Sequence, residues 1–243
     1  MKKSVKVAIQ GVSGAFHDTA AREYFKERDI TIVPCITFEE LFDSLNRGEC
    51  HYGVVAVENS VAGILSHNFV LLNNYSMQIE GELYLRIVQN LMALPGTTLD
   101  SIEEVRSHPI ALRQCHLFLN ELREKKVLIS ECEDTALAAK VISTQQLKGV
   151  ATIAGRLAAK LYNLEILKEG IESNSRNFTR FLIIKKSDTP VSQEVYKSGA
   201  NKASVSFTLK HEQGMLCKVL TIFSKYNLNM SMIENSENIE LVK

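Results

Sequence analysis

The segment VKVAIQGVSGAFHDTAAREYFKE, residues 5–27, carries the pattern that determines the fold class. Its first six residues are mostly apolar and predict a buried strand, and a turn with two glycines follows at residues 11–14. Residues 18–27 then place their apolar side chains, among them Ala21 and Phe25, on one face of a helix. A strand joined to an amphipathic helix by a short turn is typical of α/β proteins.

The same alternation continues toward the C-terminus. Short apolar runs predict further strands, and amphipathic runs predict helices. The predicted strands are residues 31–36, 52–57, 126–130 and 149–154, and the predicted helices that follow the last two are residues 134–143 and 155–163. This arrangement indicates an α/β fold with a largely parallel sheet.

The helix after the second strand has recognisable start and stop signals. Thr37 followed by Glu40 predicts a capping box, in which each side chain bonds the backbone of the other residue. Ile36 and Leu41 are spaced as a hydrophobic staple across this start. Gly48 stands where a glycine ends a helix.

Composition limits the classes of partner. The 243-residue chain has 28 basic and 28 acidic side chains, so its formal net charge is zero. A surface for nucleic acid or anionic membrane would need a basic excess, so we expect neither partner. No run of 18 apolar residues and no signal peptide occur, and we expect a cytoplasmic protein.

The cysteines and histidines indicate no metal chemistry. Five cysteines without a C-x-x-C pair suit a reducing compartment, where they behave as small buried apolar groups. The six histidines show no metal-ligand spacing. We therefore expect no metal and no cofactor.

Four polar segments follow predicted strands or lead into them. They are GVSG (11–14), ENSVAG (58–63), SHPIALRQC (107–115) and NFTRF (177–181). In open α/β sheets ligands bind beyond the carboxyl ends of strands. Any one segment is explained by a turn or a helix cap, but four together predict a cleft lined by hydroxyls and amides. The residues alone leave acid-assisted elimination and plain ligand binding both open.

With these motifs, the chain resembles the prephenate dehydratase family. The similar segments are GVSGAFHDTAAREYF (11–25), VVAVENSVAGIL (54–65), VRSHPIALRQCHLFL (105–119) and IESNSRNFTRFLII (171–184), and the Asn-x-Thr-Arg-Phe motif in the last is the most specific. KASVSFTLKHEQGMLCKVLTIFSKYNLNMSMIE (202–234) resembles the first half of an ACT regulatory domain. The five segments occur in the family's order.

The resemblance implies a catalytic domain of two α/β lobes at residues 1–186, similar to type II periplasmic binding proteins. One lobe would hold residues 1–80 and 170–186, and the other residues 81–169. A linker, residues 187–202, would lead to a partial ACT domain of ferredoxin-like α+β type at residues 203–243.

The resemblance also implies an activity, the conversion of prephenate to phenylpyruvate with loss of carbon dioxide and water. Thr179 would hydrogen-bond the leaving hydroxyl, Arg180 would pair with a substrate carboxylate and Phe181 would exclude water. The residues implied to bind substrate are Glu58, Asn59, Ser60, Gly63, Ser107, His108, Gln114 and Asn177.

Two positions depart from the family pattern. Asn68 stands where many members have Thr or Ser, and Gln89 stands where many have His. Both affect substrate contacts more than the reaction. Arogenate dehydratase, which acts on the amino analogue, and a non-catalytic amino-acid-binding protein of the same fold remain alternatives.

The ACT-like segment implies regulation and assembly. Its residues near an L-phenylalanine effector site would be Gly214, Met215, Leu216 and Glu234. Because an ACT domain has the order β-α-β-β-α-β and 41 residues remain from Ala203 onward, we expect a truncated or shortened domain, with strands at residues 203–209 and 228–234 around one helix. Feedback inhibition should then be weak or missing, and we expect a homodimer or homotetramer.

Overall fold

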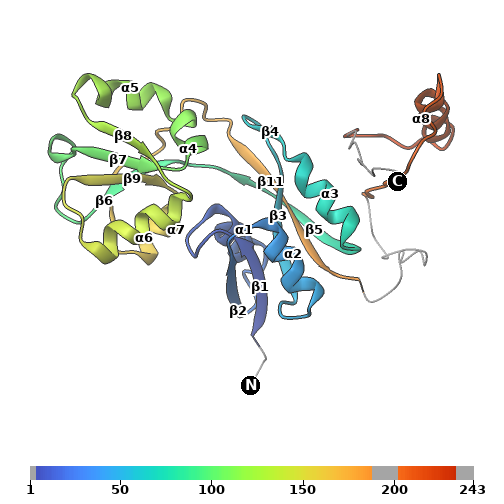
Figure 1. The fold of residues 1–243 in the computed structure, drawn as a ribbon, viewed down its shortest axis with the longest axis horizontal. Coiled ribbons are helices and arrows are strands. Elements are labelled where there is room, and N and C mark those ends of the chain that lie inside the picture. Colours follow the sequence, from blue (N-terminus) through green and yellow to red (C-terminus); the bar gives the residue numbers. More distant parts are fainter. Residues whose placement is uncertain (1–3, 188–201, 234–243) are drawn as a thin grey trace, which may run out of the picture. The chain divides into compact units, whose positions relative to one another are not determined.

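The computed structural model of the protein describes residues 4–187 and 202–233, which belong to two compact units divided after Asp188. The first unit contains two β-sheets with helices on both faces of each (Figure 1). The predicted two-lobed α/β fold is confirmed. Among the described residues, no helix combines the length and the apolar character that crossing a membrane requires.

The sheet of the first lobe has the strand order β2-β1-β3-β11-β5, with β4 attached to β3. Strands β1, β2 and β3 are parallel, and β11 is antiparallel to both β3 and β5. The strands are β1 (Val5–Gln10), β2 (Ile30–Cys35), β3 (Tyr52–Asn59), β4 (Gly63–Ile64), β5 (Met77–Arg86) and β11 (Phe178–Lys186). Helix α1 (Phe16–Tyr24) covers one face, and α2 (Phe38–Asn46) and α3 (Ser66–Asn74) cover the other.

The sheet of the second lobe has the order β10-β6-β9-β7-β8. Its strands are β6 (Asn90–Ala93), β7 (Glu104–Ser107), β8 (Leu128–Glu131), β9 (Val150–Ala154) and β10 (Glu165–Lys168), and a short 3-10 turn lies at Leu99–Ser101. Its helices are α4 (Pro109–Gln114), α5 (His116–Glu124), α6 (Thr135–Gln145) and α7 (Arg156–Leu161).

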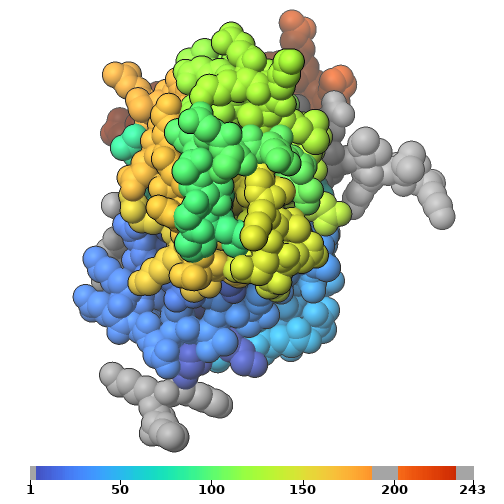
Figure 2. Space-filling model, turned by 90° about the vertical axis from the view of Figure 1, so that its left-hand side faces the viewer, coloured from blue at the N-terminus to red at the C-terminus, as the bar shows by residue number. Residues whose placement is uncertain are grey.

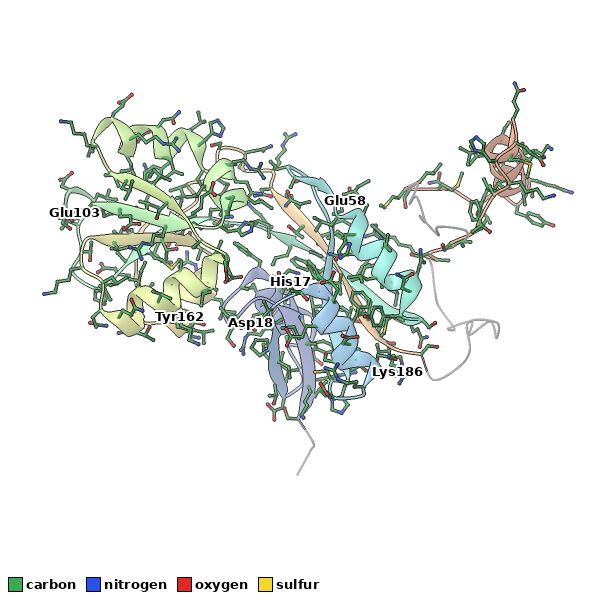
Figure 3. All side chains as sticks on the ribbon, in the orientation of Figure 1. His17, Asp18, Glu58, Glu103, Tyr162 and Lys186 are labelled. Carbon is green, nitrogen blue, oxygen red and sulfur yellow. The ribbon has the colours of Figure 1, made fainter. Side chains whose placement is uncertain are left out.

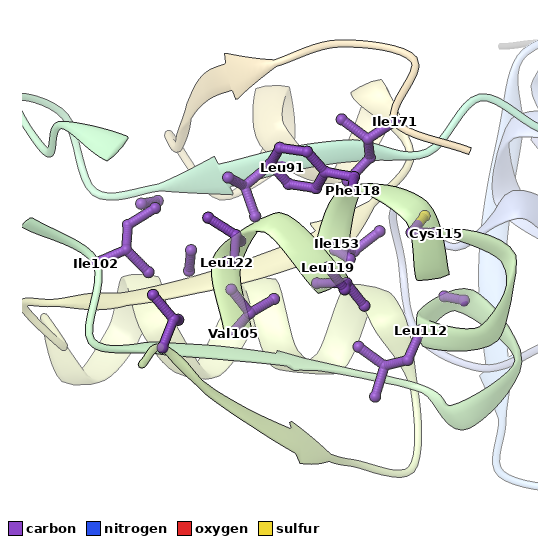
Figure 4. Packing of buried hydrophobic residues seen from close by; sticks show 14 residues of the cluster. Leu91, Ile102, Val105, Leu112, Cys115, Phe118, Leu119, Leu122, Ile153 and Ile171 are labelled. Carbon is purple, nitrogen blue, oxygen red and sulfur yellow. The ribbon is translucent and has the colours of Figure 1, made fainter. Parts of the chain in front are cut away.

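Helices α4 and α5 pack on one face of the second sheet, and α6 and α7 on the other (Figure 1). Leu91 and Ile153 point to the α5 side, where they meet Phe118 and Leu119 (Figure 4). Their strand neighbour Met92 points the opposite way, as strand alternation requires. The near-continuous apolar composition of these strands therefore follows from burial on both faces.

The boundary between the lobes differs from the prediction. Strand β5 stays in the first sheet as far as Arg86, so the expected division after residue 80 is six residues too early. Two crossover segments join the lobes, residues 87–89 and 169–177. The second lobe is thus one continuous piece of chain, while β11 returns to complete the first.

Helix α1 begins two residues before the predicted start and ends three before the predicted end. Asp18 lies in its first turn and accepts a hydrogen bond from the Gly14 N–H (2.8 Å), which fixes the early start. At the other end, the Arg28 N–H bonds Phe25 O in a tight turn.

The start of α2 is partly as predicted. Thr37 Oγ1 accepts from the Glu40 N–H (3.2 Å), as a cap does. Glu40 Oε2 accepts from the Ile36 N–H (2.6 Å), one residue before the expected one. The predicted staple is wrong, because Ile36 is 82% exposed and contributes no packing. Gly48 ends the helical region with a φ of +72°, which favours glycine.

The cysteines are all free. Cys35, Cys50 and Cys115 are buried, as expected of small apolar groups. Cys132 is half-buried and Cys217 is exposed, so the expectation is wrong for Cys217.

In the second unit, α8 (Met215–Lys225) forms where a helix was predicted. The predicted strands do not form within residues 202–233. In a ferredoxin-like sheet the first two strands are separated by a third, so neither supplies hydrogen bonds to the other. The last predicted strand residue, Glu234, and most of the linker, residues 188–201, lie outside the described residues.

Candidate functional site

The loop after β1 belongs to the first lobe and contacts the second lobe. Ser13 O accepts from the Tyr162 hydroxyl (2.6 Å), and Ala15 is buried among residues of α6 and α7. In Figure 3 Tyr162 lies on the second lobe and His17 on the first, and in Figure 2 the green and yellow surface of the second lobe adjoins the blue first lobe. The carboxyl end of β1 therefore meets the second lobe directly.

Gly11 and Gly14 allow this close approach. A Cβ on Gly11 would lie 2.7 Å from Asp134 Oδ2, and one on Gly14 would lie 3.0 Å from the Ala158 backbone. Both glycines have φ near +90°. The loop is a tight turn, the ordinary explanation of this segment, because the Gly11 N–H bonds Cys35 O and the Gly14 N–H bonds Asp18.

A network of amides and a hydroxyl lies where β3 ends and β11 begins. Asn59 Nδ2 donates to Asn177 Oδ1 (2.8 Å) and to Thr179 Oγ1 (2.9 Å). Asn59 Oδ1 accepts from the N–H groups of Val61 (3.0 Å) and Ala62 (2.7 Å), which fixes the amide orientation. All three side chains of the network are at least 90% buried. The predicted motifs ENS and NFTRF are therefore in direct contact.

A β-bulge precedes this network. Phe181 pairs with Ala56 and Arg180 pairs with Glu58, so in these two fully described strands Val57 has no counterpart on β11. The β11–β5 ladder keeps its register at the same point. The extra residue therefore belongs to β3.

The bulge decides which face Asn59 occupies. Val55 and Val57 pack with α2 and α3, and simple alternation would place Asn59 on that same face. Thr179 lies opposite Leu85, which packs on the α1 side. Only because of the extra residue does Asn59 reach the α1 face and bond Thr179.

Thr179 retains a free proton. Its Oγ1 accepts the Asn59 hydrogen bond, and in the part of the chain that the structure describes its own O–H has no acceptor. Asn177 Nδ2 is likewise a buried donor without a partner within residues 4–187. Both unpartnered donors therefore belong to side chains that bond the Asn59 amide.

Ser60 and Gly63 shape the loop beside the network. Ser60 Oγ donates to Arg176 O (2.7 Å) and accepts from the Phe178 N–H (2.9 Å), so it links the loop to the start of β11. Gly63 is exposed in β4 with a φ of +89°. Ser60 thus holds the backbone, and its hydroxyl is fully used.

The two crossover segments are linked by hydrogen bonds. The Ile87 N–H donates to Asn177 O (2.8 Å), and the Ile171 N–H donates to Gln89 O (2.9 Å). Glu172, whose side chain is 2% exposed, accepts from the Gln89 N–H (3.0 Å) and pairs with Arg86 (3.5 Å). Asn177 is therefore positioned by the same segments that connect the lobes.

Gln114 joins this junction from α4. Its Oε1 accepts from Gln89 Nε2 (3.1 Å), and its backbone oxygen accepts from the Ser173 N–H (2.7 Å). Burial raises the pKa of the neighbouring Cys115 to about 12, with a smaller contribution from the Glu172 charge. Gln114 thus holds the junction together, which the sequence did not indicate.

Ser107 and His108 lie at the carboxyl end of β7. Ser107 is fully buried and donates to Ile153 O (2.7 Å). His108 caps α4, because its Nδ1 accepts from the Ile110 N–H (3.2 Å), and its proton is therefore on Nε2. Pro109 is the first helical residue, as predicted.

Asp134 lies near His108 and against Gly11 of the other lobe. It caps α6 by accepting from the Leu137 N–H (2.7 Å). Burial raises the pKa of Asp134, while hydrogen bonds from the backbone N–H groups of Leu137 and Ala136 counter part of that rise. Sequence reasoning missed this carboxylate because an Asp before a helix is ordinarily only a cap.

Arg180 and Glu58 are not part of the Thr179 network. Arg180 forms a close ion pair with Glu82 (2.9 Å) and lies over the Tyr84 ring, across the strand from Thr179. Glu58 pairs with Arg180 in the ladder and so also occupies the face away from Thr179. The predicted pairing of Arg180 with a substrate carboxylate stays a prediction, and in the structure the guanidinium pairs with Glu82.

Phe181 belongs to the core of the first lobe. It is 1% exposed, and its ring meets His17 edge-on at 5.0 Å. The predicted role of Phe181 in excluding water stays a prediction, and the structure places its ring in the core. Burial lowers the pKa of His17 to about 4, so this ring is neutral at neutral pH. No sequence pattern distinguished His17 from an exposed histidine.

The predicted effector residues lie at the start of α8. Gly214 has a φ of +78° and precedes Met215 and the 49% exposed Leu216. The turn therefore forms as predicted, while Glu234 is outside the described residues.

A surface cavity of about 480 Å³ lies at the opposite edge of the first sheet, where Arg28, His51 and Lys186 are among its lining residues. No residue of the Asn59 network lines it. The cavity is therefore separate from the site built by the motifs.

The arrangement defines a class of protein, a two-lobed α/β protein whose polar groups gather where strands of both lobes end. The chain belongs to the prephenate dehydratase family, whose family model matches residues 7–189. It is 34% identical to arogenate dehydratase 2 of Petunia hybrida over 232 residues. It is 32% identical to the bifunctional chorismate mutase/prephenate dehydratase of Aquifex aeolicus (strain VF5) over 235 residues.

These matches cover 95% and 97% of this chain, but the chain spans only 56% and 62% of the length of those two relatives. Among solved structures, GqqA, described as a novel type of quorum quenching acylase, is 28% identical with a TM-score of 0.76, covering 96% of this chain and 83% of that one. The prephenate dehydratase of Arthrobacter aurescens in complex with L-Phe is 23% identical with a TM-score of 0.79, covering 96% and 77%. The latter likeness concerns the fold.

Proposed function

We propose that the chain converts prephenate to phenylpyruvate, as a hydro-lyase of phenylalanine biosynthesis. The observation that carries this proposal is the Asn59–Thr179 hydrogen bond, which occupies the Thr179 oxygen as an acceptor and leaves its proton available to another group. Membership of the prephenate dehydratase family supports the same assignment.

The reaction needs little from the protein. The bond from the ring to its carboxylate breaks and its electron pair enters the ring, while the bond from C4 to the hydroxyl breaks on the other side. The departing hydroxide takes a proton and becomes water, and the ring becomes aromatic. Because aromatisation drives the process, the protein needs to assist hydroxide departure and to hold the dianion.

Thr179 would assist departure as a hydrogen-bond donor. A threonine hydroxyl is a weak acid. The hydrogen bond that the Asn59 amide donates to its oxygen polarises the hydroxyl and strengthens the hydrogen bond that it can donate itself. A preorganised donor at developing negative charge contributes roughly 3–4 kcal/mol. Asn177 Nδ2, the second unpartnered donor, would bond the same oxygen or an adjacent carboxylate.

The remaining predicted residues would act in two ways. His108 presents Nε2–H from the second lobe and would bond a carboxylate. Asn59, Ser60, Ser107 and Gln114 each have a side-chain hydrogen bond to another part of the protein, so they would hold the frame. This division assigns binding to fewer groups than the sequence suggested.

Substrate entry would require the lobes to separate. Thr179 is 8% exposed and Asn177 is 1% exposed, so neither donor is accessible in the closed arrangement described here. The crossover segments 87–89 and 169–177 are the connections about which such a movement would occur.

Turnover of prephenate tests the proposal, with phenylpyruvate detected by ultraviolet absorbance. Thr179→Ala should lose roughly 100- to 1000-fold in kcat, while Thr179→Ser should keep a measurable share because its hydroxyl remains. Thr144→Ala, an exposed threonine on α6, is the matched control and should behave like wild type. A Thr179→Ala enzyme as active as wild type would refute the assignment.

Arogenate is a second candidate substrate, because the Petunia relative is an arogenate dehydratase. It carries an amine in place of the side-chain ketone, so the same elimination would give phenylalanine. Comparing kcat/KM for the two compounds decides between them. The Thr179 donor serves either substrate.

The geometry gives less support to the acylase activity described for GqqA. A hydroxyl nucleophile needs a base to take its proton. Within the described residues Thr179 receives a bond from an amide and gives none to a base. Elimination is therefore the better reading of this site.

Regulation and assembly complete the proposal. L-phenylalanine is the effector to test, because the Arthrobacter enzyme holds it. Since residues 202–233 contain α8 but no strand, we expect weak inhibition at most, and strong sigmoidal inhibition at submillimolar phenylalanine would contradict this. We also propose a cytoplasmic homodimer or homotetramer, which sedimentation would test.

A further inference from the structure

The β3 bulge needs its own support. An extra residue interrupts the regular ladder, and backbone groups at that point require other partners. The Val57 carbonyl accepts from the Leu65 N–H (2.9 Å). The Ala56 carbonyl accepts from Asn68 Nδ2 (2.7 Å). Both donors lie at the start of α3.

Asn68 contributes the side chain in this arrangement. It lies in the first turn of α3 and is 2% exposed. Its nitrogen must face Ala56, because the alternative orientation would place two carbonyl oxygens together. Its Oδ1 is buried and has no partner within residues 4–187.

The unpartnered oxygen argues that the residue is retained for its donor. A buried acceptor without a hydrogen bond costs roughly 1–3 kcal/mol. A leucine of similar shape would fill the same space without that cost. The hydrogen bond to the Ala56 carbonyl is therefore the only one that the Asn68 side chain makes within the described residues.

The contacts connect Asn68 to the site in two steps. The Asn68 amide holds the Ala56 carbonyl, and the bulge that begins there turns Asn59 to the α1 face. Asn59 in turn donates to Thr179. Loss of the bulge would return Asn59 to the face of Val57, where it cannot reach Thr179.

We propose that Asn68 is a positioning residue that acts on Thr179 through the β3 bulge. This inference rests on the proposed dehydratase function for its kinetic part and on the structure alone for its geometric part. A purely structural role would change the stability of α3 and leave kcat unaltered.

Asn68→Leu is the principal test, because it keeps the size and removes the donor. We expect kcat to fall roughly 10- to 100-fold, since small displacements at a reacting group have effects of this order, while KM changes much less. Asn68→Thr retains a donor and should recover part of the loss. Asn73→Leu, exposed on the same helix, is the matched control and should leave kcat unchanged.

A second measurement does not depend on activity. In the folded wild type the Asn59 side-chain N–H protons should exchange slowly in NMR spectra, because both are hydrogen-bonded. Asn68→Leu should speed that exchange, and Asn73→Leu should not. If Asn68→Leu fails to fold, Asn68→Thr carries the same comparison with a smaller effect.

The outcomes separate the two proposals. A wild type that converts neither prephenate nor arogenate refutes the dehydratase function, while the NMR comparison still decides the role of Asn68. Wild-type kcat in Asn68→Leu, or unchanged Asn59 exchange in that variant, overturns the positioning role.

Discussion

Charged side chains near the site serve the protein's own structure. Arg180 and Glu82 pair at 2.9 Å with side chains only 17% and 23% exposed. Glu172 and Arg86 pair at the junction of the lobes. In the Asn59 network, the donors that have no acceptor within residues 4–187 belong to a hydroxyl and an amide, Thr179 and Asn177. Substitutions of charged and of neutral residues should therefore have different consequences.

Arg180 and Glu82 should behave as an energetic pair. Arg180→Gln and Glu82→Gln should each lower the free energy of unfolding, and the double variant should lose less than the sum, with a coupling of roughly 0.5–3 kcal/mol. Denaturant titration of all four proteins measures this. The exposed pair Lys125–Asp100 is the control, with coupling close to zero.

The same variants test whether Arg180 also binds a substrate carboxylate. If Arg180 acts only through its pair, Glu82→Gln should reproduce the kinetic effect of Arg180→Gln. A large rise in KM confined to Arg180→Gln would restore the carboxylate-binding role.

His17 should make stability depend on pH. Its pKa of about 4 in the folded protein lies below the ordinary histidine value of 6.5, so the stabilisation is present above pH 6.5 and is lost as pH falls toward 4. The loss should reach at most about 3 kcal/mol. His17→Leu should flatten the dependence measured by urea unfolding across this range.

The exposed His116 provides the comparison. His116→Leu should keep the wild-type dependence on pH. An unchanged dependence in His17→Leu would show that other groups cause it.

At the scale of elements, the two crossover segments join the lobes and also hold Asn177 of the Asn59 network. The backbone bonds of Ile87 to Asn177 and of Ile171 to Gln89 make a short ribbon of the two segments. Glu172 adds its carboxylate between them. The start of β11, and with it Thr179, is therefore held by the connection between the lobes.

Substitutions of Glu172 test the hydrogen bond between its carboxylate and the Gln89 N–H. Glu172→Gln keeps an acceptor for the Gln89 N–H and should cost little, whereas Glu172→Leu leaves that N–H buried and unpaired, at a cost of roughly 1–3 kcal/mol in unfolding free energy. Denaturant unfolding of both variants measures the difference. Glu169→Gln, at an exposed position on the same segment, should be neutral, and equal stability of the two Glu172 variants would contradict the argument.

Local elements were predictable where local chemistry determines them. The strand at Val5–Gln10, the cap at Thr37 and the helix start at Pro109 follow from periodicity and backbone chemistry within a few residues. The bulge was not predictable, because an extra residue in β3 appears only when β3 is paired with β11. The ion pair of Arg180 was not predictable for a related reason, since its partner Glu82 lies on the neighbouring strand β5 but is far away in the sequence.

At the scale of the whole molecule, the core side chains of the first unit come from residues 5–184. Within the second unit, no residue of α8 is buried. The stability of the first unit therefore has its source in its own two sheets.

A chain cut after Ser187 should test this. We expect it to unfold cooperatively, with a melting temperature within a few degrees of the corresponding transition of the full chain. Calorimetry of the two chains makes the comparison. Loss of the cooperative transition would show that residues beyond 187 contribute to the core.

The return of β11 to the first sheet has a consequence for synthesis on the ribosome. Asn59 and Thr179 are 120 residues apart, and at bacterial or eukaryotic elongation rates Thr179 is made roughly 6 to 24 s after Asn59. During that interval β11 is missing from its place between β3 and β5 in the first sheet. The continuous second lobe, in contrast, has all its strands once Lys168 has been made. The nascent chain thus exposes two unpaired strand edges until β11 emerges, so chaperone binding should be greatest in that window.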